Sequence, residues 1–188
     1  MDEIELVRRA IAGDTTAWEP LVLAHQKPVF RLAYLFIKDA DEAEDIAQET
    51  FIRAYRMLGR FDTSRPLRPW LLGITSNLAR NRIRSVGRYL AALVRGYRAD
   101  TPQSVNVEQK SAQHWESQTI WKAVQRLESS DQQVIYLRIF MDLSVSEAAE
   151  AMMVAEGTVK SRLNRALGRL REVIQREFPA LEEGKAGW

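Results

Sequence analysis

Apolar residues recur at helical spacing along this chain, and no other feature restricts its fold as strongly. They come three or four positions apart through most of the sequence. Val and Ile do occur, but never in the alternating runs bounded by turn residues that indicate strands. The sequence therefore predicts an all-α protein.

The first four predicted helices form one module. They cover roughly residues 4–12, 16–38, 41–58 and 69–84. Thr16 and Glu19 have the spacing of a capping box, and Pro69 suits the first turn of the fourth helix. That helix has a predicted buried stripe of Leu71, Ile74, Leu78 and Ile83, and a predicted polar face of Ser76, Asn77, Arg80, Asn81 and Arg84.

A second helical module follows a segment without periodicity. Its predicted helices cover roughly 119–127, 130–140, 144–152 and 156–178, and capping boxes are predicted at Ser130 with Gln133 and at Ser144 with Glu147. Residues 99–111 are rich in Asp, Thr, Pro, Gln, Ser and Asn, which is typical of a linker. We expect a first domain at 1–86, a flexible linker at 87–115, a second domain at 116–180 and a tail at 181–188.

Charge alternates along the chain although the net charge is only +2. Residues 1–50 carry 5 basic and 11 acidic side chains, whereas residues 51–98 carry 11 basic and 1 acidic, and all 11 are Arg. Such a block attracts a polyanion, and Arg favours bidentate contacts to phosphate or bases. The alternative interpretation is a solvated helical surface, which a single charge run would favour.

Several classes of protein are disfavoured by composition. The chain has no Cys and two His, His25 and His114, and it contains no phosphate-binding glycine loop, nucleophile elbow or metal-ligand spacing. We expect no catalysis, metal, cofactor or small-molecule substrate. No run approaches 18 apolar residues, and the start is acidic where a signal peptide is basic, so we expect no membrane insertion and a cytoplasmic location.

Residues 144–166 have the pattern of a helix-turn-helix. Ala149 supplies the small residue between the helices, and Val159 takes the inward position of the second helix. The outer face of that helix carries Thr158, Lys160, Ser161, Arg162, Asn164 and Arg165. Donors of this kind near a helix N-terminus suit major-groove reading. The alternative is a helical hairpin with a basic outer face. Met153 stands where the turn commonly takes Gly, at a cost of about 1 kcal/mol if φ is positive.

Two segments resemble one known family. Residues 154–166 resemble region 4 of the extracytoplasmic-function sigma factors, and residues 41–55 resemble region 2, as do Arg60-Phe61-Asp62 and Arg68-Pro69-Trp70-Leu71. The resemblance covers nearly the whole chain in the right order. It implies a four-helix region 2 module and a helix-turn-helix region 4 module. It also implies an alternative sigma factor that binds core RNA polymerase, recognises minus-ten and minus-thirty-five promoter elements and directs transcription initiation, in a stress or envelope response under an anti-sigma factor.

The resemblance also assigns residues. Asp45, Gln48 and Glu49 would bind the β′ clamp helices of core polymerase, and region 4 would bind the β flap. Phe61 and Asn77 would accept a flipped base of the minus-ten element, while Arg53, Arg80 and Arg84 hold backbone phosphates. Thr158, Lys160, Ser161, Asn164 and Arg165 would face the minus-thirty-five groove, and Arg138 a phosphate. The loop from Phe61 to Pro69 departs from the family pattern, because Leu67 stands where an aromatic is frequent. Trp70 is interpreted as a core residue, with base stacking as the alternative.

Two other functions stay open at this point. One is an enzyme. The other is a stand-alone helix-turn-helix regulator with a sensing N-terminal module, which would bind its promoter without polymerase. A linker of about 30 residues spans up to about 100 Å, so it permits both modules to read promoter elements roughly 70 Å apart.

Overall fold

The fold is all-α in the part of the chain that the structure describes. The computed structural model describes residues 2–96 and 119–178, with side chains at 2–86 and 119–178. These ranges contain helices and turns and no strand, as the apolar periodicity predicts. No helix in them is long and apolar enough to cross a membrane. Most of the predicted linker and the predicted tail lie outside the described residues.

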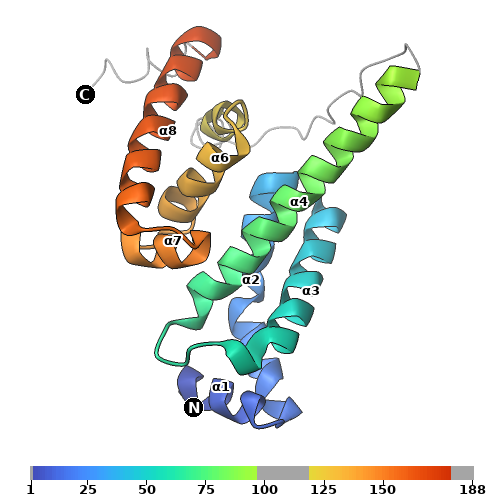
Figure 1. The fold of residues 1–188 in the computed structure, drawn as a ribbon, viewed down its shortest axis with the longest axis vertical. Helices are drawn as coiled ribbons and strands as arrows, with labels where there is room; N and C mark the ends of the chain where they lie inside the picture. Colours follow the sequence, from blue (N-terminus) through green and yellow to red (C-terminus); the bar gives the residue numbers. More distant parts are fainter. Residues whose placement is uncertain (1, 97–118, 179–188) are drawn as a thin grey trace.

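The first module is built on three long helices that lie side by side (Figure 1). Its elements are α1 (Glu3–Ile11), a 3-10 turn η1 (Thr15–Ala17), α2 (Trp18–Ile37), α3 (Ala40–Met57), a second 3-10 turn η2 (Leu58–Arg60) and α4 (Leu67–Gly96). Helices α2, α3 and α4 contact one another, and α1 packs across the N-terminal end of α2. Val29, Leu32 and Leu72 are fully buried between them.

The start of α2 and the end of α4 differ from the sequence prediction. The capping box at Thr16 and Glu19 is wrong, because Asp14 caps this turn: its Oδ1 accepts the Thr16 backbone N–H at 3.0 Å and the Thr16 hydroxyl at 2.6 Å. Helix α2 accordingly begins at Trp18. Helix α4 continues twelve residues past Arg84, to Gly96, because no proline interrupts this Arg-, Ala- and Leu-containing stretch.

The second module contains the helix-turn-helix. Residues 119–124 are helical, and α6 (Ser129–Ile135), a π-helical turn η3 (Tyr136–Phe140), α7 (Val145–Met152) and α8 (Glu156–Glu177) follow. The predicted capping box at Ser144 is confirmed: its Oγ accepts the Glu147 N–H at 3.1 Å, and its own N–H donates to Glu147 Oε2 at 2.7 Å. The predicted box at Ser130 is wrong. Helix α6 begins one residue earlier, and the Gln133 side chain bonds α4 instead.

The two modules pack directly on each other. Helix α7 contacts α4, and the buried rings of Phe36 and Tyr136 meet edge to face with centroids 4.9 Å apart. Figure 1 shows α6 and α7 lying between α8 and α4. Ser76, predicted on the polar face of α4, is fully buried at this contact. The second module covers this part of the polar face of α4, which the apolar periodicity of α4 alone does not reveal.

The turn from α7 into α8 contains a residue in the left-handed conformation. Met153 has φ 54° and ψ 46°. Its N–H bonds the Glu150 carbonyl at 3.1 Å, and the next N–H, of Val154, bonds the Ala149 carbonyl at 3.0 Å, which is the pairing of a Schellman motif. Gly normally takes this position because a Cβ is crowded there. The Met153 side chain is 80% exposed, so its own packing offsets little of this strain.

Replacing this methionine by glycine tests the strain. We expect Met153→Gly to raise the free energy of unfolding by about 0.5–1 kcal/mol, the relief of the left-handed strain less the extra entropy of an unfolded glycine. Urea unfolding followed by circular dichroism measures it. Met152→Gly is the matched control, because Met152 is buried and right-handed helical, and it should destabilise. A destabilising effect of Met153→Gly would contradict the interpretation.

Candidate nucleic-acid interface

Helix α8 presents a polar face to solvent. Its inward stripe includes Val159, Ala166, Leu170 and Val173, all buried against the second module. The predicted duplex-reading residues Lys160, Ser161, Asn164 and Arg165 lie on the other side and are exposed. Thr158, at the start of the helix, is half-buried, and its carbonyl accepts the Ser161 hydroxyl at 3.1 Å. The structure thus brings the four exposed residues onto one accessible surface.

Arg138 is tied into its own loop. It lies in η3, half-buried, and its Nη1 donates to the Leu143 carbonyl just before α7 begins. Its Nε is buried with no hydrogen-bond partner among the described residues. The predicted phosphate contact at this position stays a prediction, and in this structure Arg138 supports the loop that leads into the helix-turn-helix.

The loop before α4 is ordered by one aspartate. Asp62 accepts hydrogen bonds from the Ser64 hydroxyl at 2.6 Å, the Ser64 N–H at 3.0 Å and Arg65 Nε at 3.1 Å. The Ser64 bonds, with Arg65, hold the pKa of the Asp62 carboxyl below its usual value. The loop is flanked by an aromatic pair: the ring centroids of Phe61 and Trp70 are 4.8 Å apart, and the ring planes are tilted by 41°. Leu67, where the family commonly has an aromatic, is buried at the start of α4.

The predicted minus-ten residues on α4 divide into two groups. Asn77 is half-buried and Arg84 is exposed, with Nη2 donating to Asn81 Oδ1 at 2.8 Å. Arg80 instead contacts the second module: Nε donates to Ser129 Oγ at 3.0 Å and Nη1 to Gln133 Oε1 at 2.7 Å. Burial lowers the pKa of its guanidinium from the usual value, with smaller contributions from the positive charges of Arg84 and Arg162.

A groove between α3 and α4 brings the predicted polymerase residues together. It has a volume of about 620 Å³, and its lining includes Asp45, Gln48, Glu49 and Arg53. Arg53, predicted to hold a phosphate, pairs with Glu49 at 2.6 Å across one helical turn. Both side chains are about half exposed, so this pair is worth well under about 1 kcal/mol and exchanges readily for another partner.

Sequence reasoning missed three residues at the contact between the modules. Arg68 donates to the Met141 carbonyl at 2.7 Å, and Trp121 donates to the Leu35 carbonyl at 3.3 Å. Gly73 faces the backbone of α7. A glycine inside a predicted helix was the one available signal, since it commonly indicates close packing.

His25 lies in the packing between α1 and α2. It is buried in α2, and its Nε2 lies 2.7 Å from Glu3 Oε2 of α1. His114 lies outside the described residues. Within the two described ranges, no group of three His, Asp or Glu side chains is placed to hold a metal ion.

Comparisons with known proteins match both modules. Residues 21–89 match the family model of sigma-70 region 2, and residues 117–170 match that of sigma-70 region 4. The RNA polymerase sigma-H factor of Pseudomonas aeruginosa is 31% identical over 95% of this chain and 95% of its own length. The ECF RNA polymerase sigma factor SigW of Bacillus subtilis is 32% identical over 90% of this chain and 95% of its own length.

Solved structures agree at the level of the fold. The sigma factor RpoE of Bartonella quintana, in complex with the anti-sigma factor NepR, matches 85% of this chain and 97% of its own with a TM-score of 0.64 and 26% identity. CnrH, in complex with the cytosolic domain of CnrY, shares the fold over 93% of this chain and 98% of its own, with a TM-score of 0.69 and 23% identity. With both regions matched in order along nearly the full length, the chain belongs to the extracytoplasmic-function group of the sigma-70 family and is an alternative sigma factor, which directs RNA polymerase in transcription initiation.

Proposed function

We propose that this sigma factor reads duplex minus-thirty-five DNA with α8, and the exposed polar face of that helix is the observation that carries the proposal. Lys160, Ser161, Asn164 and Arg165 are exposed together near the N-terminal end of the second helix of a helix-turn-helix. Asn pairs bidentately with adenine, and Arg with guanine or phosphate. Thr158 borders this face, and Arg138 is a candidate phosphate contact next to it.

The first module, in this proposal, holds the melted minus-ten strand. Phe61 packs on Trp70 and is half-buried, and Asn77 is half-buried on the helix that follows the loop. An aromatic wall and an amide are suitable chemistry for a flipped base. Arg53, Arg84 and Arg80 supply cations for the backbone phosphates. Arg53 and Arg84 are exposed in this conformation, whereas Arg80 is engaged by the second module.

Core polymerase docks, in the same proposal, on α3. Asp45 and Gln48 are exposed and Glu49 is half-exposed on one side of this helix, and all three line the groove next to α4. Acidic and amide side chains at the centre of an interface supply specificity and association rate more than bulk affinity. The β′ clamp helices are the proposed partner here, and the β flap that of the second module.

The remaining parts of the proposal concern the whole chain. We assign residues 1–86 and 116–180 to the two domains, 87–115 to the linker, whose first residues 87–96 continue helix α4, and 181–188 to a tail. The protein acts in the cytoplasm, without catalysis of its own and without a cofactor. An anti-sigma factor holds it inactive until a stress or envelope signal. The Bartonella quintana relative, whose structure is a complex with an anti-sigma factor, supports this last point.

Run-off transcription tests the function directly. The full-length protein, incubated with core RNA polymerase and fragments of its host genome, should produce discrete transcripts that core polymerase alone does not make. Because phosphate contacts dominate the affinity, their yield should fall steeply as salt rises. Absence of core-dependent initiation at every fragment, together with tight promoter binding by the protein alone, would favour the stand-alone regulator instead.

Substitution of Asn164, the amide residue on α8, tests the assignment of the minus-thirty-five contacts. Asn164→Ala should weaken binding of the holoenzyme to its minus-thirty-five duplex by about 1–3 kcal/mol, the value of one bidentate base contact, and relax specificity at one base pair. Arg171→Ala, further along the exposed side of α8, is the control. It removes a cation outside the assigned residues and should leave specificity unchanged. Equal losses for both variants would argue against base reading by Asn164.

The docking face on α3 gives a separate prediction. The combined substitutions Asp45→Ala, Gln48→Ala and Glu49→Ala should lower the affinity for core polymerase at least about tenfold, equivalent to about 1.4 kcal/mol. The free energy of unfolding should change little, because these side chains are exposed or half-exposed. Fluorescence titration of core polymerase measures the affinity, with Glu5→Ala on α1 as the acidic control. Unchanged affinity would remove α3 from the interface.

A further inference from the structure

One face of helix α2 combines positive charge with aromatic rings. Its residues follow helical spacing, and they are Lys27, Phe30, Arg31, Tyr34 and Lys38. All are exposed except Tyr34, which is half-buried. Residues 20–38 contain no Asp or Glu, although the N-terminal part of the chain is acidic. Neither Lys27 nor Arg31 has a hydrogen bond or ion pair to another residue in the described part of the chain, so both cations are available to a ligand.

Three aromatic rings form a row that crosses from α2 to the second module. The rings of Phe30 and Tyr34 have centroids 6.2 Å apart and planes 17° from parallel. Trp121 continues the row beside Tyr34, at 6.0 Å and 18°. Its Nε1 donates to the Leu35 carbonyl at 3.3 Å, which fixes this ring. Phe30 stands at the other end of the row and is 37% exposed, so a flat ligand can stack on a ring that is held by its neighbours.

A groove beside Phe30 is large enough to hold a nucleobase. This α2–α3 groove has a volume of about 380 Å³, and its apolar lining includes Phe30 and Phe51. Its polar lining consists of Gln26, Lys27, Glu44 and Gln48. Amide and carboxylate groups can hydrogen-bond the edge of a base, while aromatic walls contact its faces.

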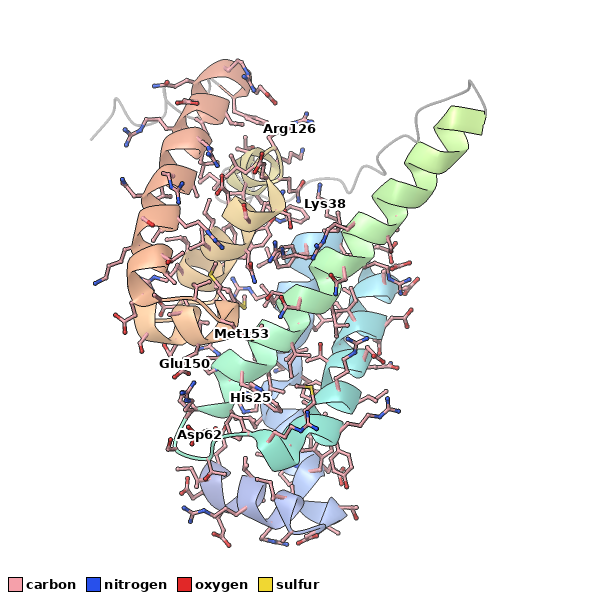
Figure 2. The ribbon with its side chains drawn as sticks, in the orientation of Figure 1. His25, Lys38, Asp62, Arg126, Glu150 and Met153 are labelled. Atoms are coloured by element: carbon pink, nitrogen blue, oxygen red, sulfur yellow. The ribbon has the colours of Figure 1, made fainter. Side chains whose placement is uncertain are left out.

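A second pair of cations lies at the far end of the aromatic row. The Lys38 ammonium is 6.0 Å from the centroid of the Trp121 ring. Arg126 of the second module lies near Lys38 (Figure 2), and burial, followed by the charge of Arg126, lowers the pKa of the lysine ammonium. Arg126 has a carboxylate partner, Glu177 at 3.0 Å, whereas Lys38 has none among the described residues. An anion between Lys38 and Arg126 would relieve their repulsion.

We propose that this face of α2 binds single-stranded nucleic acid, with one base in the α2–α3 groove against Phe30 and phosphates on Lys27 and Arg31. The strand continues along the aromatic row toward Lys38. A polyanion is the occupant because every charge on this face of α2 is positive. It is a single strand because only unpaired bases offer their faces to aromatic side chains. Lys27 and Lys38 are about 16 Å apart along the helix, so a few nucleotides cover the site.

A strand bound here would compete with core polymerase. Gln48 lines the α2–α3 groove and also the groove between α3 and α4, where we assign it to polymerase docking. Single-stranded nucleic acid would therefore keep the free factor from the polymerase. This consequence rests on the proposed function, whereas the strand site itself does not.

Photocross-linking locates the strand. The probe is an oligonucleotide of about eight nucleotides that carries iodouracil, a base that cross-links to an aromatic side chain on which it stacks. After irradiation of the full-length protein, mass spectrometry should find a cross-link at Phe30, besides any at Phe61 or Trp70. Cross-links confined to Phe61 and Trp70 would overturn the proposal.

Salt dependence tests the phosphate contacts. Each phosphate neutralised on a single strand contributes about 0.7 to the slope of log affinity against log salt concentration. Lys27→Ala combined with Arg31→Ala should therefore reduce that slope by about 1.4, measured by fluorescence anisotropy of the labelled probe. Arg8→Ala combined with Arg171→Ala is the matched control, because it removes two exposed cations elsewhere. Equal slopes for the two double variants would show a general attraction to positive charge and no site on α2.

Replacing Phe30 separates base stacking from protein docking. Phe30→Leu keeps an apolar side chain at this exposed position but removes the aromatic face, so strand affinity should fall about tenfold. Leu23→Ala is the control, because Leu23 is 58% exposed on α2 and does not line the groove. Unchanged strand affinity of Phe30→Leu would overturn the stacking. A loss of affinity for core polymerase alone would assign this face to a protein partner instead.

Competition with polymerase is measured separately. Excess unlabelled strand should weaken the binding of core polymerase to the parent protein more than to the variant with Lys27→Ala and Arg31→Ala. An equal effect on both, with the Phe30 cross-link present, would refute the competition and the assignment of Gln48 to both partners. The strand site would stand in that case, because the cross-link and the salt slope test it independently of polymerase.

Discussion

The close contact of α4 with α7 at Gly73 determines how the two modules pack on each other. A Cβ at that position would lie 2.7 Å from the Ala151 carbonyl oxygen, so only glycine permits this approach. In the same contact between the modules, Gln133 of α6 bonds Ser76 and Arg80 of α4. The contact also places Tyr136 against Phe36, which makes the two modules share one hydrophobic core. Arg65, in the loop before α4, lies close to Glu150 of α7 at the same contact.

Several described arginines of the basic segment have protein partners in this conformation, and the ion pairs among them are weak. Arg53 pairs with Glu49 and Arg65 with Asp62, both at exposed positions where an ion pair contributes well under about 1 kcal/mol. Arg80 bonds neutral groups. A nucleic-acid strand offers phosphates at close intervals and releases counterions when it binds. In the proposed strand complex, the polyanion would therefore compete with these intramolecular partners for the arginines.

Local rules predicted the helix-turn-helix well, because its signals act within a few residues. The Ser144–Glu147 capping box formed as predicted, and Val159 and Ala149 are buried as the pattern requires. The same capping rule failed at two other places. At Thr16, the Asp14 carboxylate accepts the backbone N–H and the hydroxyl of Thr16. At Ser130, the Gln133 side chain bonds Ser76 of α4 instead. A sequence pattern identifies residues that are able to cap, but it does not reveal which competitor lies nearer in space.

By itself, the sequence determined two helical modules, their order and the polar face of α8, because apolar periodicity reports which side of a helix turns inward. It did not determine what covers an outward side. Ser76 and Arg80 were predicted on one polar face of α4, and only the tertiary structure decided that Ser76 is buried and Arg80 engaged by α6. The physical reason is that a polar helix face has the same sequence pattern whether its side chains hydrogen-bond Gln133 or water. Gly73, a glycine inside a predicted helix, was the one sequence feature that indicated this contact.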